Sequence, residues 1–164
     1  VFENTLYRMK MIGEQVKKYL EHSARFFNQQ PGNPLVNENI RGYNFDLLSG
    51  VTYEIDVTKP LGQRIQNLCY QGKPLDPKQV FTVAINNYRA NGGGGFMEAI
   101  GGAGEIDWRS SEEIRNLLIT YVTKTKELDG RFEKNWKLAP EAVVAQAVAQ
   151  AIEKMKQERE AGKR

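Results

Sequence analysis

The chain has 164 residues, of which 40% are hydrophobic, and a formal net charge of +3. This length predicts one domain with a substantial core plus a tail, and is too short for two full domains. Lys and Arg are spread along the sequence, so no basic patch that would bind a nucleic-acid polymer is predicted. No apolar run reaches the length of a membrane span. Cys69 is the only cysteine, which excludes an internal disulfide and a cysteine-based metal cluster.

The first third of the chain predicts a strand, a helix and a loop. Apolar residues alternate with charged ones around Tyr7, Met9 and Met11, the pattern of a half-buried strand. From residue 14 to about 27 the apolar spacing changes to every three or four residues, which predicts an amphipathic helix. Prolines and glycine concentrated in residues 29–39 then predict a flexible loop.

Three more strands are predicted in the middle of the chain. Residues 51–57 alternate, and residues 65–70 read as a neighbouring strand after a proline-glycine turn. Residues 80–85 are strongly β-prone and are predicted to form a central strand. Polar and glycine residues follow this strand at once, at 86–96. Ligand groups commonly lie at the carboxyl end of a strand because the scaffold is rigid there.

Two helices are predicted towards the end of the chain. Ser110 and Glu113 fit a capping box, and the buried face of the helix that follows is predicted to hold Ile114, Leu117, Leu118, Tyr121 and Val122. Pro140 fits the first position of a last helix, which is predicted to solvate beyond Met155 towards Arg164 because that segment is mostly charged. Together these elements predict an α+β fold, with mixed β-sheets flanked by helices and a long C-terminal helix.

Few components of an independent catalytic centre are visible. The single histidine, His22, and the single cysteine argue against a zinc site and a Cys-His nucleophile. No compact acidic signature indicates a magnesium or calcium site. No Lys-Ser or Lys-Thr pair follows Gly92–Gly95, so this run is not a phosphate-binding P-loop, and it also lacks the spacing of a dinucleotide fingerprint.

Binding chemistry is better represented, in the segment Asn86–Phe96. The flat ring of Tyr88 could stack on a nucleobase, while the neighbouring amides hydrogen-bond to its polar edge. Gly42–Asp46 is a second cluster of this character, and the two together would form an aromatic sandwich. Two plainer interpretations remain: residues 86–96 form an ordinary surface loop, and Tyr43, Phe45 and Tyr88 are ordinary core aromatics.

Several ordered motifs resemble the C-terminal domain of the 5′-nucleotidase family, and most closely its bacterial branch of 2′,3′-cyclic-nucleotide 2′-phosphodiesterases that also cleave 3′-nucleotides. The motifs are Gly42–Tyr53, Asp56–Pro60, Asn86–Phe96 and Asn135–Pro140, and the resemblance runs from about Phe2 to Pro140. The resemblance implies that this chain grips the nucleoside, while hydrolysis takes place on an N-terminal metallophosphoesterase domain carrying two divalent metal ions.

The resemblance also assigns substrate-binding residues. Tyr88 matches one ring of the family's base sandwich; the other ring matches Tyr43 or Phe45, with Tyr43 preferred because this branch favours tyrosines. The remaining assigned positions are Asn87, Arg89 and Asn91, which shape the pocket; Gly92 and Gly93, which allow backbone to approach the ribose; and Asn4, which matches an asparagine near the pocket. No catalytic residue, metal ligand or cofactor is assigned to this chain, so the isolated chain is expected to be inactive.

Two departures from the family pattern bear on these assignments. Gly94 occupies the position of an acidic residue that holds the ribose hydroxyls in ecto-5′-nucleotidases, which fits substrates that carry phosphate on those hydroxyls. The chain also begins downstream of an arginine-bearing segment, and Val1 is interpreted as a cut within a longer protein.

The expected domain boundaries are 1–139 for nucleotide recognition, truncated at its N-terminus, and 140–164 for the C-terminal helix and tail. The parent is expected to be secreted, periplasmic or attached to the cell surface. Two alternative functions are a stand-alone, non-catalytic nucleotide-binding module and a structural or interaction domain.

Overall fold

The computed structural model describes residues 3–102, 104–130 and 133–162, and the chain forms two compact units. The first unit holds Val1–Tyr19 and Leu75–Lys134, and the second holds Leu20–Pro74 and Asn135–Arg164. The predictions that involve Val1, Phe2 and Arg164 lie outside the described residues.

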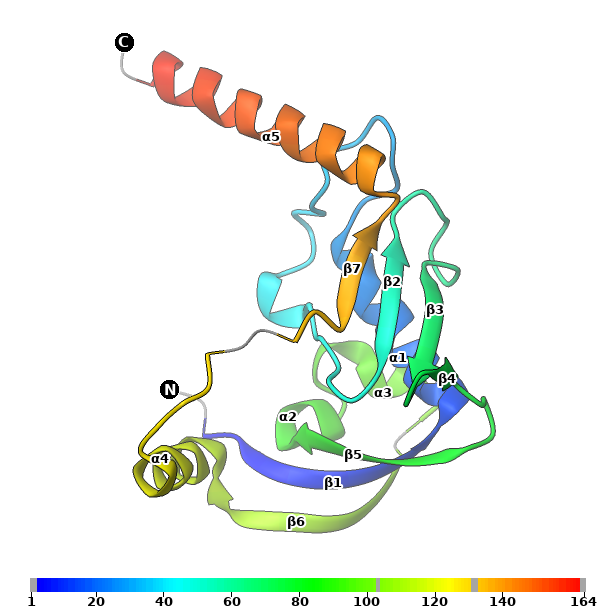
Figure 1. Cartoon of the computed structure of the whole chain (residues 1–164), viewed down its shortest axis with the longest axis vertical. Coiled ribbons are helices and arrows are strands. Elements are labelled where there is room, and N and C mark those ends of the chain that lie inside the picture. The colour runs from blue at the N-terminus through cyan, green and yellow to red at the C-terminus, as the bar shows by residue number, and fades with distance from the viewer. Residues whose placement is uncertain (1–2, 103, 131–132, 163–164) are drawn as a thin grey trace. The chain divides into compact units, whose positions relative to one another are not determined.

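The first unit is built on a three-stranded antiparallel sheet of order β5-β1-β6, in which β1 is Thr5–Ile12, β5 is Val80–Asn86 and β6 is Glu105–Glu113 (Figure 1). The prediction that 80–85 is a central strand is therefore wrong, because β1 holds the centre. Met9 and Met11 of β1 are buried, whereas Val80 of β5 is 60% exposed. The β-prone side chains of β5 suit an edge strand equally well.

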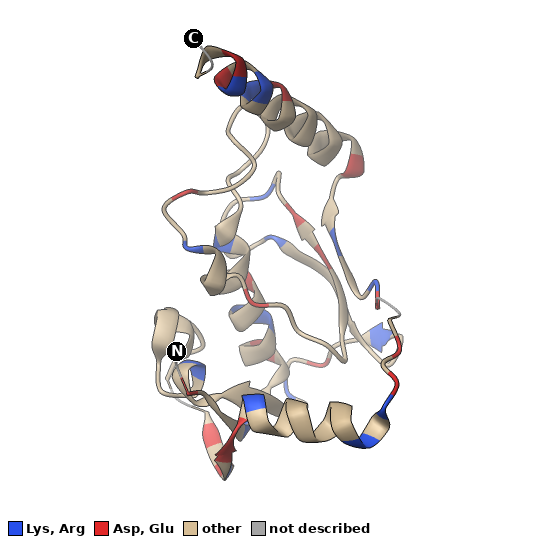
Figure 2. Cartoon of the chain, turned by 90° about the vertical axis from the view of Figure 1, so that its left-hand side faces the viewer, with Lys and Arg blue, Asp and Glu red and all other residues tan. Residues whose placement is uncertain are grey.

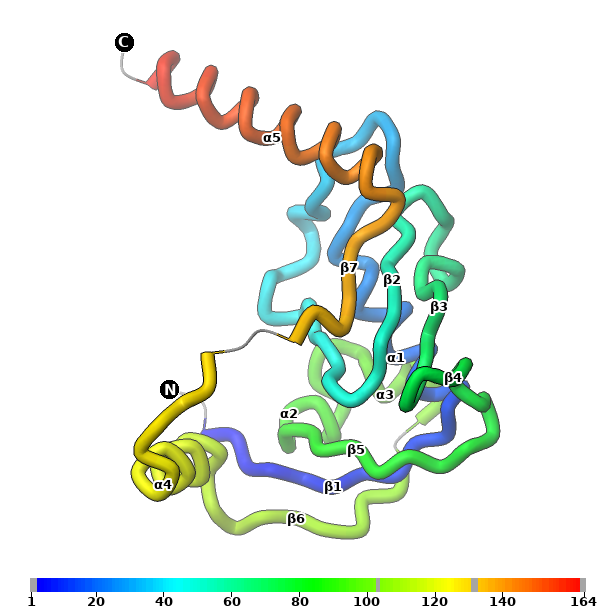
Figure 3. Tube along the Cα trace, viewed as in Figure 1, coloured from blue at the N-terminus to red at the C-terminus, as the bar shows by residue number. Residues whose placement is uncertain are grey.

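Two short helices and a turn follow β5 directly. They are α2 (Asn87–Ala90), the 3₁₀ turn Gly93–Gly95 and α3 (Phe96–Ala99), and the tube in Figure 3 shows β5 running into α2 without an intervening loop. Phe96, Met97 and Ile100 are buried. The polar and glycine segment is thus fixed at one end by β5 and at the other by buried side chains.

The helix α4, at Ile114–Thr125, differs from its prediction in two ways. Ser110 lies in β6, where its Oγ accepts a hydrogen bond from the Glu112 N–H at 2.9 Å. The predicted capping box is wrong because β6 stays paired with β1 as far as Glu113. The predicted buried face is also wrong for most of its residues, since Leu118 and Tyr121 are each 59% exposed. Ile114 and Leu117 are half-buried, and no residue of α4 is fully buried.

The second unit is built on a four-stranded mixed sheet of order β4-β3-β2-β7. Strands β2 (Thr52–Asp56), β3 (Ile65–Tyr70) and β4 (Lys73–Pro74) are antiparallel neighbours, whereas β7 (Trp136–Ala139) runs parallel to β2. Alternate residues of the β2 segment are buried: Val51, Tyr53, Ile55 and Val57. The two strands predicted here are confirmed, as is their pairing.

Helices complete the fold and confirm its α+β class. Helix α1 (Gly13–Ser23) continues as a 3₁₀ turn at Ala24–Phe26, close to the predicted span. Helix α5 (Glu141–Ala161) begins directly after Pro140, and only Ala147 among its residues is buried. Figure 2 shows charged residues gathered in the C-terminal half of α5, which is solvated as predicted. No helix among the described residues is both long and apolar enough to span a membrane.

Candidate functional site

The segment after β5 is held in place by the amides of its asparagines. Asn86 caps α2, since its side chain accepts a hydrogen bond from the Arg89 N–H at 2.8 Å. Asn87 Oδ1 accepts from the Thr5 N–H of β1 at 3.1 Å. The Asn91 N–H donates to the carbonyl of Asn87 at 3.0 Å. The side chains of Asn86 and Asn87 and a backbone bond of Asn91 thus hold the segment around Tyr88 in place.

Tyr88 and Arg89 lie side by side in α2 but differ sharply in exposure. Tyr88 is 47% exposed, whereas Arg89 is 4% exposed. The Arg89 guanidinium carbon lies 5.2 Å from the centroid of the Tyr88 ring and 4.5 Å from that of the buried Phe96 ring. This arrangement presents the tyrosine ring at the surface and encloses the arginine between aromatic rings.

Three of the four consecutive glycines need backbone that only glycine adopts readily. Gly92, Gly94 and Gly95 have φ angles of 95°, 74° and 76°, in the left-handed region, where a β-carbon is strained. Gly93 is not among the positive-φ residues. The glycine run therefore makes a tight turn close to Tyr88. The backbone angle does not explain the glycine at position 93, which needs another reason.

The last residue predicted for this half of the site, Asn4, directly precedes Thr5 in the chain. Its carbonyl accepts a hydrogen bond from the Ile114 N–H at 2.8 Å. Because Thr5 is bonded to Asn87, Asn4 lies near the start of α2. The first unit thus brings together Asn4, Asn87, Tyr88, Arg89, Asn91, Gly92 and Gly93.

The second unit carries the other predicted ring, on a 3₁₀ turn at Gly42–Asn44. Tyr43 is 70% exposed. Phe45 is half-buried in an aromatic cluster, and its ring stacks on Phe26 with centroids 5.0 Å apart and an interplanar angle of 15°. The rings of Phe27 and Trp136 contact Phe45 edge-on. Phe45 therefore supports the turn, and Tyr43 projects from it.

A buried hydroxyl anchors the end of this turn. Ser23 Oγ donates to the carbonyl of Asp46 at 2.6 Å and accepts from the Asp46 N–H at 2.8 Å. No sequence motif predicted this role for Ser23, because the two residues are distant in the chain. The only signal in the sequence was a serine near the end of the helix predicted for residues 14 to about 27.

Buried hydrogen bonds of Glu21 and Arg64 support the segment next to the aromatic cluster. Glu21 accepts hydrogen bonds from the backbone N–H groups of Arg64 and Ile65 at 2.9 and 2.8 Å. The Arg64 guanidinium donates to the carbonyls of Ala24 and Phe27 at 3.0 and 2.6 Å. Burial lowers the pKa of Arg64, and the charge of Glu21 acts in the opposite direction. The Arg64 guanidinium thus fixes the 3₁₀ turn that carries Phe26.

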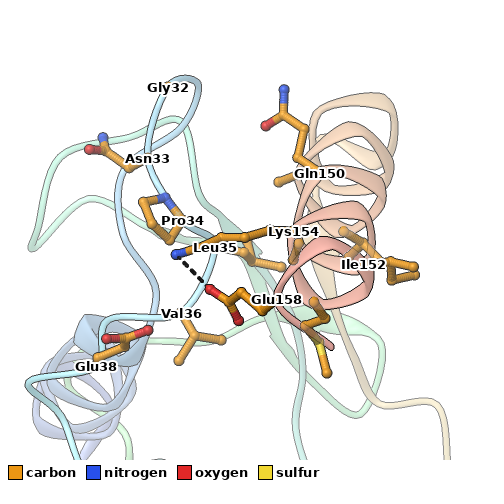
Figure 4. Close-up of a pocket in the computed structure, with 14 residues that line it drawn as sticks. Gly32, Asn33, Pro34, Leu35, Val36, Glu38, Gln150, Ile152, Lys154 and Glu158 are labelled. Carbon is orange, nitrogen blue, oxygen red and sulfur yellow. Dashed lines mark ion pairs between the residues drawn. The ribbon is translucent and has the colours of Figure 1, made fainter. Parts of the chain in front are cut away.

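A groove lies between α5 and residues 32–38 of the second unit, with a volume of about 650 Å³ (Figure 4). Its lining is mainly aliphatic, including Leu35, Val36 and Ile152, with an ion pair of 3.8 Å between Lys154 and Glu158 at its edge. No aromatic residue lines it, so a nucleobase could not stack there. The ring-bearing segments remain the candidate site.

No metal centre accompanies these segments in the part of the chain that the structure describes. Within residues 3–102, 104–130 and 133–162, no three His, Cys, Asp or Glu residues lie close enough to hold an ion.

The 5′-nucleotidase C-terminal domain family matches residues 1–100, so the chain belongs to the 5′-nucleotidase family as a C-terminal domain. It is 41% identical over 157 residues to the trifunctional nucleotide phosphoesterase protein YfkN of Bacillus subtilis, covering 85% of this chain and 11% of that protein.

Two further comparisons agree with this family assignment. A 2′,3′-cyclic-nucleotide 2′-phosphodiesterase/3′-nucleotidase of Haemophilus influenzae is 38% identical over 164 residues, which cover 85% of this chain and 24% of that protein. The structure of a 5′-nucleotidase precursor from Thermus thermophilus superposes with a TM-score of 0.67 at 25% identity, over 85% of this chain and 26% of that one. The chain thus spans about a quarter or less of the relatives it matches.

Proposed function

We propose that this domain recognises the nucleoside part of a nucleotide for a 2′,3′-cyclic-nucleotide 2′-phosphodiesterase/3′-nucleotidase. The observation that carries the proposal is the half-exposed Tyr88 ring on a rigid support beside a glycine turn. A flat exposed ring contributes about 1–3 kcal/mol per stacked base. Asn87, Asn91 and Asn4 supply polar groups beside it, and Gly92 lets backbone approach the sugar.

Tyr43 provides the second ring of the base sandwich. It is highly exposed, whereas the Phe45 ring is already stacked on Phe26.

Hydrolysis takes place outside this chain, on an N-terminal metallophosphoesterase domain of the parent protein. The relatives are longer than this chain and carry phosphoesterase names. On that domain, divalent metal ions would activate water and stabilise the charge on phosphate. Residues 1–139 form the recognition domain, and 140–164 form a helix and tail that extend from it. The parent protein is secreted, periplasmic or attached to the cell surface.

The proposal is tested by calorimetric titration of the purified chain with 3′-AMP. Replacing Tyr88 with Ala should weaken binding by roughly tenfold or more, and Tyr88→Phe should retain it. Tyr121→Ala is the matched control, because Tyr121 is an exposed tyrosine of α4. Equal affinities for wild type and Tyr88→Ala would refute the role of Tyr88.

A second assay tests the division of labour. The purified chain, supplied with divalent metal ions, should leave a 2′,3′-cyclic nucleotide intact. Hydrolysis by this chain would show that it holds a catalytic centre of its own.

A further inference from the structure

The conformation of Gly93 is ordinary, but its surroundings are not. A β-carbon at Gly93 would lie 2.5 Å from Cζ and 2.6 Å from both Cε atoms of Tyr88, far inside van der Waals contact. At Gly92, by comparison, a β-carbon would meet nothing within 4 Å. Gly92 is therefore needed for its backbone angle and Gly93 for the space that the Tyr88 ring occupies.

The three distances also show which part of the ring is covered. A point beyond the ring edge would lie nearest the phenolic oxygen, whereas these distances are nearly equal and involve three ring carbons. Gly93 therefore lies over one face of Tyr88. Gly93 covers that face, while the side chain as a whole remains 47% exposed.

Arg89, a buried residue of the same unit, contacts both Gly93 and Tyr88. Its Nη1 donates to the carbonyl of Gly93 at 3.2 Å, and its guanidinium lies over the rings of Tyr88 and Phe96. Because Arg89 is 4% exposed, its guanidinium is enclosed by protein groups. Buried guanidinium groups prefer such planar stacking and carbonyl contacts.

We infer that Gly93 and Arg89 are positioning residues, which hold Tyr88 so that one face only is open to a planar heterocyclic base. This inference deepens the proposed nucleotide recognition and rests on it. Gly93 leaves space for the Tyr88 ring. Arg89 contacts both that ring and the backbone carbonyl of Gly93. A ligand then stacks on a ring that is already oriented, which reduces the entropic cost of binding.

A double-mutant cycle tests whether Gly93 acts through Tyr88. Gly93→Ala should weaken 3′-AMP binding on the order of tenfold in the wild-type background and have no further effect in the Tyr88→Ala background. The matched control is Gly130→Ala, because Gly130 has no positive φ and open space around its β-carbon position. Equal losses in both backgrounds would overturn the inference.

A measurement without ligand keeps the two proposals separable. The α-protons of Gly93 should resonate strongly upfield, because they lie over the face of an aromatic ring. This upfield shift should vanish in Tyr88→Ala. It should become smaller in both Arg89→Met and Arg89→Lys. An unshifted Gly93 in wild type, or an unchanged shift in Arg89→Met, would overturn the positioning role. Failure of the wild type to bind 3′-AMP would instead refute the proposed function.

Discussion

Phe45 stacks on Phe26 with ring centroids 5.0 Å apart and an interplanar angle of 15°. Two residues earlier, Tyr43 is largely exposed on the same short turn. The two rings that the family resemblance leaves as alternatives thus have different surroundings. One belongs to an aromatic cluster, and the other is 70% exposed.

This difference predicts opposite effects of two substitutions. Phe45→Ala should lower the free energy of unfolding by about 2–3 kcal/mol, because it removes three ring contacts from a half-buried cluster. Tyr43→Ala should change stability by less than about 0.5 kcal/mol but weaken binding of 3′-AMP. Denaturant unfolding and calorimetric titration of both variants separate the roles. Normal affinity in Tyr43→Ala with lost affinity in a folded Phe45→Leu would reverse the assignment.

The buried hydrogen bonds of the Arg64 guanidinium should be costly to remove. Arg64→Met leaves the carbonyls of Ala24 and Phe27 without their buried donor and should lower the free energy of unfolding by about 2–3 kcal/mol. Urea denaturation measures this change. The matched control is Lys18→Ala, which breaks the exposed pair with Glu14 and should have a much smaller effect. Similar losses in both variants would show that burial of the Arg64 hydrogen bonds carries no special weight.

Stability should also depend on Tyr53 at high pH. Burial raises the pKa of Tyr53 above its ordinary value of 10.0, and a hydrogen bond from the Leu48 N–H opposes this shift. As pH rises, the Tyr53 phenol loses its proton in the unfolded chain before it does so in the folded chain. Its contribution to the free energy of unfolding is therefore complete below pH 10.0 and is lost as pH rises through the folded-state pKa. Tyr53→Phe should lack this loss. The test is the difference in unfolding free energy between wild type and Tyr53→Phe, measured from neutral to alkaline pH; a difference independent of pH would contradict it.

Gly94 offers a test of substrate class. Its φ of 74° is tolerated by Asp and Asn better than by other side chains. Gly94→Asp should weaken binding of 3′-AMP relative to adenosine, because a carboxylate near the sugar repels its phosphate. Gly94→Asn, of similar size and uncharged, is the control. The Asp effect should shrink at high salt; an equal loss in both variants would indicate strain instead of charge.

Local sequence patterns were sufficient to predict the helices and strands whose contacts are local or whose apolar residues recur at a regular spacing. The alternation at Met9 and Met11 and the spacing in residues 14–27 predicted β1 and α1, and the β2–β3 pair followed from its turn. Strand order was not predictable in the same way. The β-prone side chains of 80–85 suit an edge as well as a centre, and only the pairing of β6 with β1 decides between them.

The errors around α4 and the missed parts of the site share a physical origin. Ser110 and Glu113 have the spacing of a helix cap, but β pairing extends to Glu113 and delays the helix. The segment 86–96 was identified because its composition is unusual. The fit of Gly93 against Tyr88, and the anchoring of Asp46 by Ser23, depend on three-dimensional contacts that composition does not encode.

The central claim, that this domain binds a nucleobase between Tyr88 and a second ring, is tested most directly by nuclear magnetic resonance of the aromatic side chains. On titration of the purified chain with 3′-AMP, the ring signals of Tyr88 and Tyr43 should shift together with one saturation curve, while those of Tyr121 should stay unchanged. Silence at Tyr88, Tyr43 and Phe45 up to millimolar ligand would contradict the claim and favour a structural domain.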